Sequence, residues 1–142
     1  MGAVNETGVI NLPCAAIYVY EGYAYVMSSG QMVLSTAVTD DVLIAAESSI
    51  DDEGNAKLLT AGQTMPFYLP STGKVVKVAS LTGITYTSLC PVYLSTTDGV
   101  VCVTTDNSTT LVGHYTGPNN VATASTGDLI DVVLDTALGG YV

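Results

Sequence analysis

The chain has 142 residues, of which 48% are hydrophobic and 11% are charged, so its composition is that of a folded protein and fits a single domain. Thirteen acidic residues stand against three lysines and no arginine, which gives a formal net charge of −10. This balance argues against nucleic-acid binding, which needs a basic surface, and against attachment to an anionic membrane.

Residues 1–15 show no periodicity and contain Gly2, Gly8 and Pro13, which predicts an extended N-terminal arm outside the core. Because an apolar arm has no reason to remain in water, its side chains are expected to reach a neighbouring subunit or another surface. Deletion of residues 1–12 should then leave the fold intact and weaken assembly. Residues 16–142 are expected to form one β-rich domain.

A hairpin is predicted next, with strands at residues 17–20 and 23–27 and a turn at Glu21-Gly22, where glycine supplies a positive φ. Tyrosines alternate with apolar residues along both strands and so gather on one face of each. They either cover a half-exposed sheet face or contact another subunit, since tyrosine offers a large contact area at low entropic cost. The four tyrosines are Tyr18, Tyr20, Tyr23 and Tyr25.

Two further apolar β-runs, residues 32–38 and 42–46, are separated by Asp40-Asp41. Residues 47–56 form the most acidic segment of the chain. Its carboxylates lack the alternate spacing and the distal glutamate of a calcium loop. The segment is therefore interpreted as a solvated turn, with a weak cation site as the alternative.

The β-pattern resumes between residues 58 and 79. Pro66 and Pro70 are expected to keep the run at 64–69 away from the centre of a sheet. In the run at 74–79, Val76 and Val78 should face opposite to Val75 and Lys77. Residues 79–90 are the one place where a short helix is considered, although their Thr and Gly content argues against a long one.

The last third of the chain contains three apolar β-runs separated by an Asp98-Gly99 turn and two further glycine breaks. The order Pro91-Val-Tyr-Leu, a glycine turn, Leu111-Val-Gly, and Gly127-Asp before a valine-rich final strand resembles the small decoration, or cement, proteins that coat tailed-virus capsids. The resemblance covers the second half of the chain and, loosely, the first. It implies four segments of core β-structure: Pro91 to Leu94, Val100 to Val103, Leu111 to Tyr115 and Leu129 to Leu134.

Proteins of that family are commonly homotrimers at three-fold or quasi-three-fold positions on the outside of the shell, where they hold capsid subunits against internal genome pressure. The resemblance therefore implies a homotrimer that binds the major capsid protein on the virion exterior, after synthesis in the host cytoplasm. It also implies that the N-terminal arm reaches a neighbouring protomer or the capsid. The predicted capsid or subunit contacts are Val9, Ile10, Leu12, Tyr18, Tyr20, Tyr23 and Tyr25.

No catalytic motif emerges from the sequence, and neither an enzyme nor a cofactor is expected. The single histidine, His114, is interpreted as a strand residue near a sheet edge. Asp128 and Asp131 lie three apart and should point to opposite faces of a strand, which does not suit the paired carboxylates of glycoside hydrolysis. Asp128 is instead expected to support the turn after Gly127.

The three cysteines, Cys14, Cys90 and Cys102, are an odd number without a CxxC pair or a metal-binding spacing. Buried thiols are expected, with a Cys90–Cys102 disulfide as the alternative. The N-terminus lacks the features of a secretory signal, and no run reaches the ~18 apolar residues of a membrane helix. These observations predict a soluble product made in the cytoplasm.

Taken together, the patterns predict an all-β fold: a compact single domain, like a barrel or a sandwich, with about ten short strands and at most one short helix. Two rival functions remain beside capsid decoration. One is another virion or surface structural subunit, such as a fibre or filament β-domain. The other is a small hydrolase or carbohydrate-binding module, whose sugar-binding version is weakened by the absence of tryptophan.

Overall fold

The computed structural model describes residues 8–69, 73–103 and 109–134, and these residues form an all-β protein without a helix. The all-β prediction is therefore confirmed. The strands are β1 (Val9–Pro13), β2 (Ala24–Ser28), β3 (Gln31–Leu34), β4 (Leu43–Ala45), β5 (Thr64–Tyr68), β6 (Val75–Ser80), β7 (Thr85–Tyr86), β8 (Pro91–Leu94), β9 (Val101–Cys102), β10 (Leu111–Tyr115), β11 (Val121–Ala122) and β12 (Asp128–Leu134).

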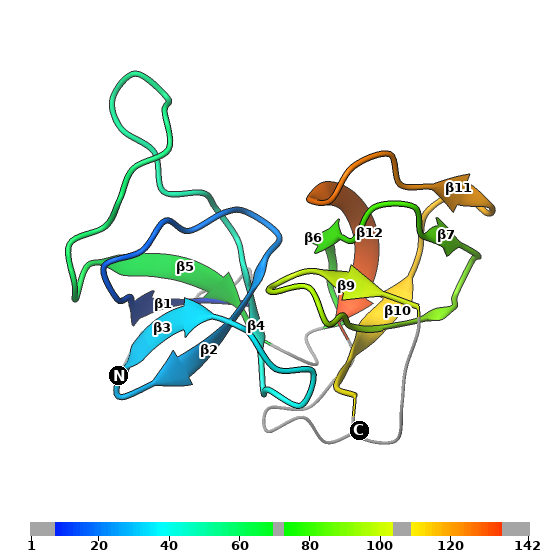
Figure 1. Ribbon diagram of the computed structural model, residues 1–142, viewed down its shortest axis with the longest axis horizontal. Helices are drawn as coiled ribbons and strands as arrows, with labels where there is room; N and C mark the ends of the chain where they lie inside the picture. Colours follow the sequence, from blue (N-terminus) through cyan, green and yellow to red (C-terminus); the bar gives the residue numbers. More distant parts are fainter. Residues whose placement is uncertain (1–7, 70–72, 104–108, 135–142) are drawn as a thin grey trace.

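The strands form two main parts, a sheet and a barrel, which follow the two halves of the sequence (Figure 1). Strands β1 to β5 make an open sheet in the order β1-β5-β4-β2-β3. Strands β6, β8, β9, β10 and β12 close into a barrel in the order β10-β12-β6-β9-β8. The short strands β7 and β11 pair with each other at the far end of the barrel.

The second half of the chain agrees closely with the sequence prediction. Strands β8 and β10 span the predicted segments, β9 lies within residues 100–103, and β12 begins one residue before Leu129. In β6, Val76 and Val78 point into the barrel while Val75 and Lys77 are exposed, as alternation requires. Each of these segments therefore contributes apolar side chains to one barrel core.

The two halves are joined by a shared core and by direct hydrogen bonds. Ala24 and Ile44 of the open sheet belong to the same buried cluster as the barrel residues. The Ala24 N–H donates to the Gly99 carbonyl at 2.8 Å, and the Thr110 N–H donates to the Val38 carbonyl at 2.7 Å. Because buried backbone groups pair across this boundary, the open sheet and the barrel form one domain.

The prediction that residues 1–15 lie outside the core is wrong for the part of the arm that the structure describes. Strand β1 pairs antiparallel with β5 over five residues, from Val9 opposite Tyr68 to Pro13 opposite Thr64. Ile10 and Leu12 are half-buried against the core of the open sheet, and Cys14 lies inside it. The sequence pattern missed this strand because its partner lies more than fifty residues away. Residues 1–7 lie outside the described structure.

Deletion of residues 1–12 should therefore destabilise the protein instead of leaving its fold intact. The expected loss is about 2 kcal/mol of unfolding free energy, because two half-buried aliphatic side chains each contribute about 1 kcal/mol. Deletion of residues 1–7 is the matched control, since it leaves β1 whole. Urea unfolding of the two truncated chains measures the difference, and equal stabilities would show that β1 adds nothing to the fold.

The first hairpin is also displaced from its predicted position. Residues 17–20 are not a strand, and the hairpin instead joins β2 to β3, with Ser28 opposite Gln31. Its two turn residues, Ser29 and Gly30, both have positive φ values, of 50° and 80°. This is the conformation that two-residue hairpin turns favour, because it matches the twist of the strands.

The expectation that Pro66 excludes its strand from the interior of a sheet is wrong. Strand β5 contains Pro66 and lies between β1 and β4. The pairing of β4 with β5 ends at Ala45 opposite Phe67, so proline falls just beyond the last residue of the short strand β4. There its missing N–H interrupts no ladder bond, and its carbonyl still accepts from the Ala46 N–H at 3.0 Å. Pro70 lies outside the described residues.

Two tyrosines are fully buried, one in each core, and their hydroxyls are hydrogen-bonded. In the barrel, the hydroxyls of Tyr86 and Ser80 lie 2.7 Å apart. In the open sheet, the Tyr25 hydroxyl accepts from the Tyr20 N–H at 2.8 Å. Burial raises the pKa of Tyr86 to about 12 and raises the pKa of Tyr25 further, because the tyrosinate anion is poorly solvated there.

Stability should therefore fall as the pH rises above 10. Below pH 10 both tyrosines are neutral in the folded and the unfolded chain, and their contribution to stability is complete. Between pH 10 and about 12 the unfolded chain loses these protons first, so unfolding becomes more favourable. Circular dichroism during an alkaline titration measures this loss. The Tyr86→Phe variant, which cannot ionise at that position, should lose less stability over the same interval.

Candidate functional site

Three tyrosines form a row on the surface, which we call the tyrosine cluster: Tyr18, Tyr20 and Tyr23. The rings of Tyr18 and Tyr20 are stacked with centroids 6.3 Å apart, and those of Tyr20 and Tyr23 are tilted with centroids 5.7 Å apart. Tyr18 is 45% exposed and Tyr20 is 43% exposed. The cluster thus presents aromatic surface in a fixed arrangement, as tyrosines at protein interfaces do.

The tyrosine cluster is held in place by the backbone on which it stands. Val19 is buried between the two exposed tyrosines, and its N–H donates to the Ser49 hydroxyl at 2.9 Å. The Ser49 N–H donates back to the Val19 carbonyl at 2.8 Å, and the Glu21 N–H donates to the Ser48 hydroxyl at 2.8 Å. Tyr18 and Tyr20 therefore lie on a segment that hydrogen bonds hold in place, although the segment is not a strand.

The prediction of Tyr25 as a surface contact is wrong. Its side chain is fully buried and packs edge-on against Phe67, with ring centroids 5.7 Å apart. Tyr23 is half-buried against the core of the open sheet, and its ring lies close to Gly99 and Gly127 of the barrel half. Tyr18 and Tyr20 are therefore the members of the predicted set with the most available surface.

Strand β1 separates two recesses, and its alternation divides the three predicted arm residues between them. Ile10 and Leu12 line an apolar groove of about 620 Å³. Val9 lines a more polar recess of about 470 Å³, together with Glu47, Tyr68 and Lys74. The remaining groove residues come mainly from β2 to β4 and the segments beside them: Val26, Met27, Met32, Thr39, Asp40, Asp41, Leu43 and Leu69.

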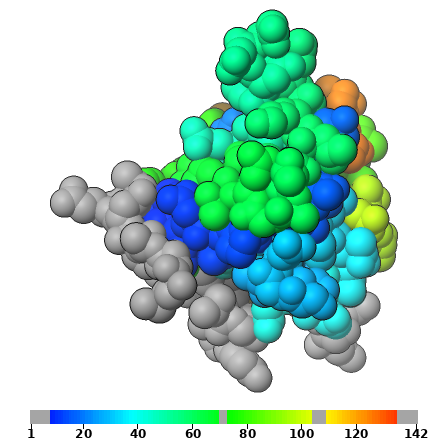
Figure 2. Space-filling model, turned by 90° about the vertical axis from the view of Figure 1, so that its left-hand side faces the viewer, coloured from blue at the N-terminus to red at the C-terminus, as the bar shows by residue number. Residues whose placement is uncertain are grey.

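The acidic segment forms a loop that projects from the body of the protein between β4 and β5 (Figures 1 and 2). Ile50 and Ala56 form a bridge at its base. The Asp51 carboxylate accepts from the N–H groups of Glu53 and Asn55, both at 2.9 Å. These bonds, that of Asn55 foremost, lower the pKa of Asp51. The carboxylate thus stabilises a tight turn, in agreement with the interpretation of residues 47–56 as a solvated turn.

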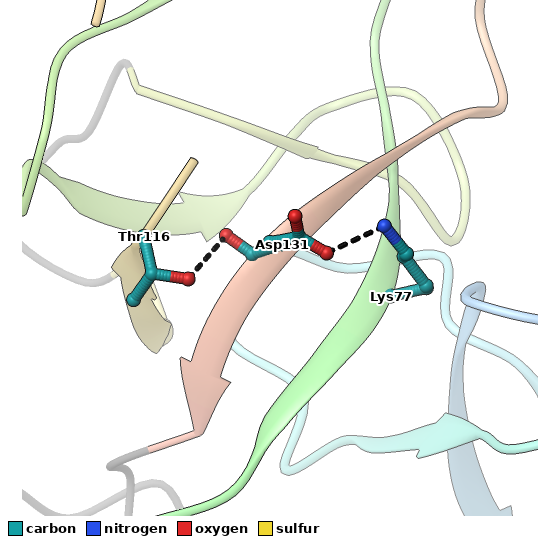
Figure 3. Close-up of polar contacts among 3 residues, drawn as sticks. All are labelled: Lys77, Thr116 and Asp131. Atoms are coloured by element: carbon teal, nitrogen blue, oxygen red, sulfur yellow. Dashed lines mark hydrogen bonds and ion pairs between the residues drawn. The ribbon is translucent and has the colours of Figure 1, made fainter. Parts of the chain in front are cut away.

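The acidic groups of β12 serve the fold, as Figure 3 shows for Asp131. Asp131 lies opposite Lys77 of β6 and forms an ion pair with it at 2.6 Å, while its main-chain carbonyl accepts from the Thr116 hydroxyl at 3.4 Å. Asp128 supports a turn, as expected, but the turn precedes it. Its carboxylate accepts from the N–H groups of Ala124 and Ser125 at 2.7 Å and 3.0 Å.

His114 lies on β10, which pairs with β8 on one side and β12 on the other. The expectation that it lies near a sheet edge is wrong, because a closed barrel has no edge. Cys14 and Cys102 are buried thiols and Cys90 is a half-buried one, so the disulfide alternative is not adopted. Among residues 8–69, 73–103 and 109–134, no three side chains of the metal-binding types are grouped to hold an ion.

The chain matches no known protein-family model and no curated protein. The resemblance to decoration proteins therefore remains a prediction. In the part of the chain that the structure describes, no helix has the length and apolar character to cross a membrane.

Proposed function

We propose that this chain is a capsid decoration protein that binds the outer surface of a tailed-virus shell and stabilises it against internal genome pressure. The observation that supports this proposal best is the coincidence between the segments of the family resemblance and the barrel. All four segments become strands of the same closed barrel, namely β8, β9, β10 and β12. The segments that carry the resemblance thus belong to one structural unit and are not scattered over the protein.

The function requires binding alone. In a homotrimer each interface can be weak, because three linked contacts to the shell raise the overall affinity. A useful contact would bury on the order of 1,000 Å² per copy. The tyrosine cluster and the exposed surface beside β1 are the proposed contacts with the major capsid protein. Tyr18 and Tyr20 are suited to this role because their rings are already ordered before binding.

A filament or fibre subunit is the second candidate, and the open sheet favours it. Strands β1 and β3 are the two edges of that sheet, and they meet at one end, where Cys14 bridges Met32 and the Ala15 N–H donates to the Met32 carbonyl at 3.1 Å. The rest of each edge has no partner strand among the described residues. An edge strand can pair with a strand of another chain, and head-to-tail repetition of such pairing gives an open polymer. A decoration protein, in contrast, stops at a closed oligomer.

Light scattering across protein and salt concentrations separates the two candidates, and capsid sedimentation then tests the first. A closed trimer that co-sediments with expanded, emptied capsids of the virus that encodes the chain is the expected result. The Tyr18→Ser/Tyr20→Ser double variant should lose most of this co-sedimentation. Ile50→Ser is the control, because Ile50 lies on the acidic loop and is 57% exposed, more than either tyrosine. Open polymers, or a wild-type chain that stays in the supernatant, would contradict the proposal.

A further inference from the structure

In the part of the chain that the structure describes, one end of this strongly acidic protein is built from residues without charge. Residues 78–97 contain no Asp, Glu, Lys, Arg or His. Residues 107–127 contain one such residue, His114. The structure brings parts of both segments together around the β7–β11 pair, at the right of Figure 1. We call residues 82–91 and 116–123 the uncharged end.

The uncharged end is tied by hydrogen bonds between its two segments. The Asn120 N–H donates to the Tyr86 carbonyl at 2.8 Å, and the Ser88 N–H donates to the Asn119 side chain at 3.1 Å. The Gly83 N–H donates to the Thr123 carbonyl at 2.9 Å. These bonds therefore order the surface before any partner binds.

Leu89 is the unusual residue of this end. It is 69% exposed, which is the highest value among the large apolar side chains that the structure describes. Its φ is +63°, a left-handed conformation that is strained for a bulky side chain and that glycine or asparagine would adopt easily. The Leu89 N–H donates to the Tyr115 carbonyl at 2.7 Å, which holds the turn in this conformation. Because most of the side chain is exposed, packing against the other described residues does little to offset this strain.

We propose that the uncharged end, which includes the exposed Leu89, is the surface through which copies of this chain bind one another. Each copy carries a net charge of −10, so contact through most other faces would bring carboxylates together. The described acidic residues all lie outside the uncharged end. Asp131 borders it at Thr116 but is paired with Lys77, and the Asp128 carboxylate beside it accepts from the N–H groups of Ala124 and Ser125. Two copies of this surface can therefore meet with less repulsion than the acidic faces would produce. Exposed Leu89 and Val121 supply apolar area for the contact.

This inference rests on the proposed function in one respect, since the proposed homotrimer needs a contact between copies. It predicts a particular salt dependence. Added salt screens the repulsion between acidic copies, so association through an uncharged, apolar surface should strengthen as ionic strength rises. An interface built on ion pairs would weaken under the same conditions.

Sedimentation equilibrium of the full-length chain and three variants tests the inference. Leu89→Asp should raise the dissociation constant at least tenfold. Leu58→Asp is the matched control, because Leu58 is 53% exposed and lies outside the uncharged end, and it should associate like the wild type. Leu89→Gly should weaken association while raising the melting temperature by about 2–4 °C, because it relieves the strained φ. A destabilised fold cannot produce that combination.

Four results would overturn the inference. They are undiminished association of Leu89→Asp, equal weakening by Leu58→Asp, a wild-type chain that stays monomeric at all salt concentrations, and loss of capsid co-sedimentation by Leu89→Asp with self-association unchanged. The last would assign the uncharged end to the capsid instead of a second copy. A monomer that still co-sediments with capsids would leave the decoration function in place.

Discussion

Replacement of Val132 by aspartate should lower the free energy of unfolding by about 4 kcal/mol, because a carboxylate would enter the barrel core without a partner. Val132 is fully buried on β12, opposite Val76 of β6 and Tyr115 of β10. It thus lies where two ladders of the barrel meet. Urea unfolding followed by circular dichroism measures the loss, and a chain this destabilised should also melt well below the wild type.

Val75→Asp is the control for this prediction. Val75 lies on the neighbouring strand β6 but points outward and is 52% exposed, so its replacement should change stability by less than about 0.5 kcal/mol. Similar losses at the two positions would mean that β12 does not present Val132 to the interior, and the assignment of faces in the barrel would be wrong.

Gly113→Ala should destabilise the chain by about 3 kcal/mol through a clash between backbones. A β-carbon at Gly113 would overlap the carbonyl oxygen of Val133 on β12 and approach the Val132 side chain. The site lies where the register of β10 against β8 shifts, between Leu111 and Gly113. Because the obstacle is backbone on a strand paired on both sides, the clash cannot be relieved by a rotamer change. Thermal and urea unfolding should both report the loss.

Gly54→Ala separates this clash from the ordinary cost of replacing glycine. Gly54 lies in the acidic loop with φ +85° and has open space around it, so alanine there should cost only about 1–2 kcal/mol, the cost of the left-handed conformation. If Gly113→Ala proved no more harmful than Gly54→Ala, the close approach of β10 to β12 would be disproved.

The strands of the barrel could be predicted from the sequence because each is a short apolar run with its own boundaries. Pro91 to Leu94 ends before the Asp98-Gly99 turn, and the final strand begins directly after Gly127. The open sheet was less predictable because its decisive contacts are distant in sequence. Nothing in residues 9–13 indicates that residues 64–68 will pair with them, and nothing around Pro66 indicates that β4 stops at Ala45.

The candidate site could likewise be predicted only in part. Alternation indicated that Tyr18 and Tyr20 share one face and that Val19 between them faces the other way, and the structure exposes the two tyrosines and buries Val19. It could not show that Tyr25 faces a core, since that depends on which side of β2 the rest of the sheet covers. The unusual position of Leu89 had no sequence signal, because its positive φ is imposed by a bond to Tyr115.

The order of strands in the barrel has a consequence for the chain during its synthesis. Strand β12 pairs with both β6 and β10, so the barrel cannot close until translation has passed Leu134. The residues of the open sheet, 9–68, are all synthesised much earlier. A nascent chain halted before β12 would therefore present the unpaired edge of β6 and an uncovered apolar core to the cell. Such products should be substrates for chaperones and proteases, and their aggregation should depend on how close to Leu134 synthesis stops.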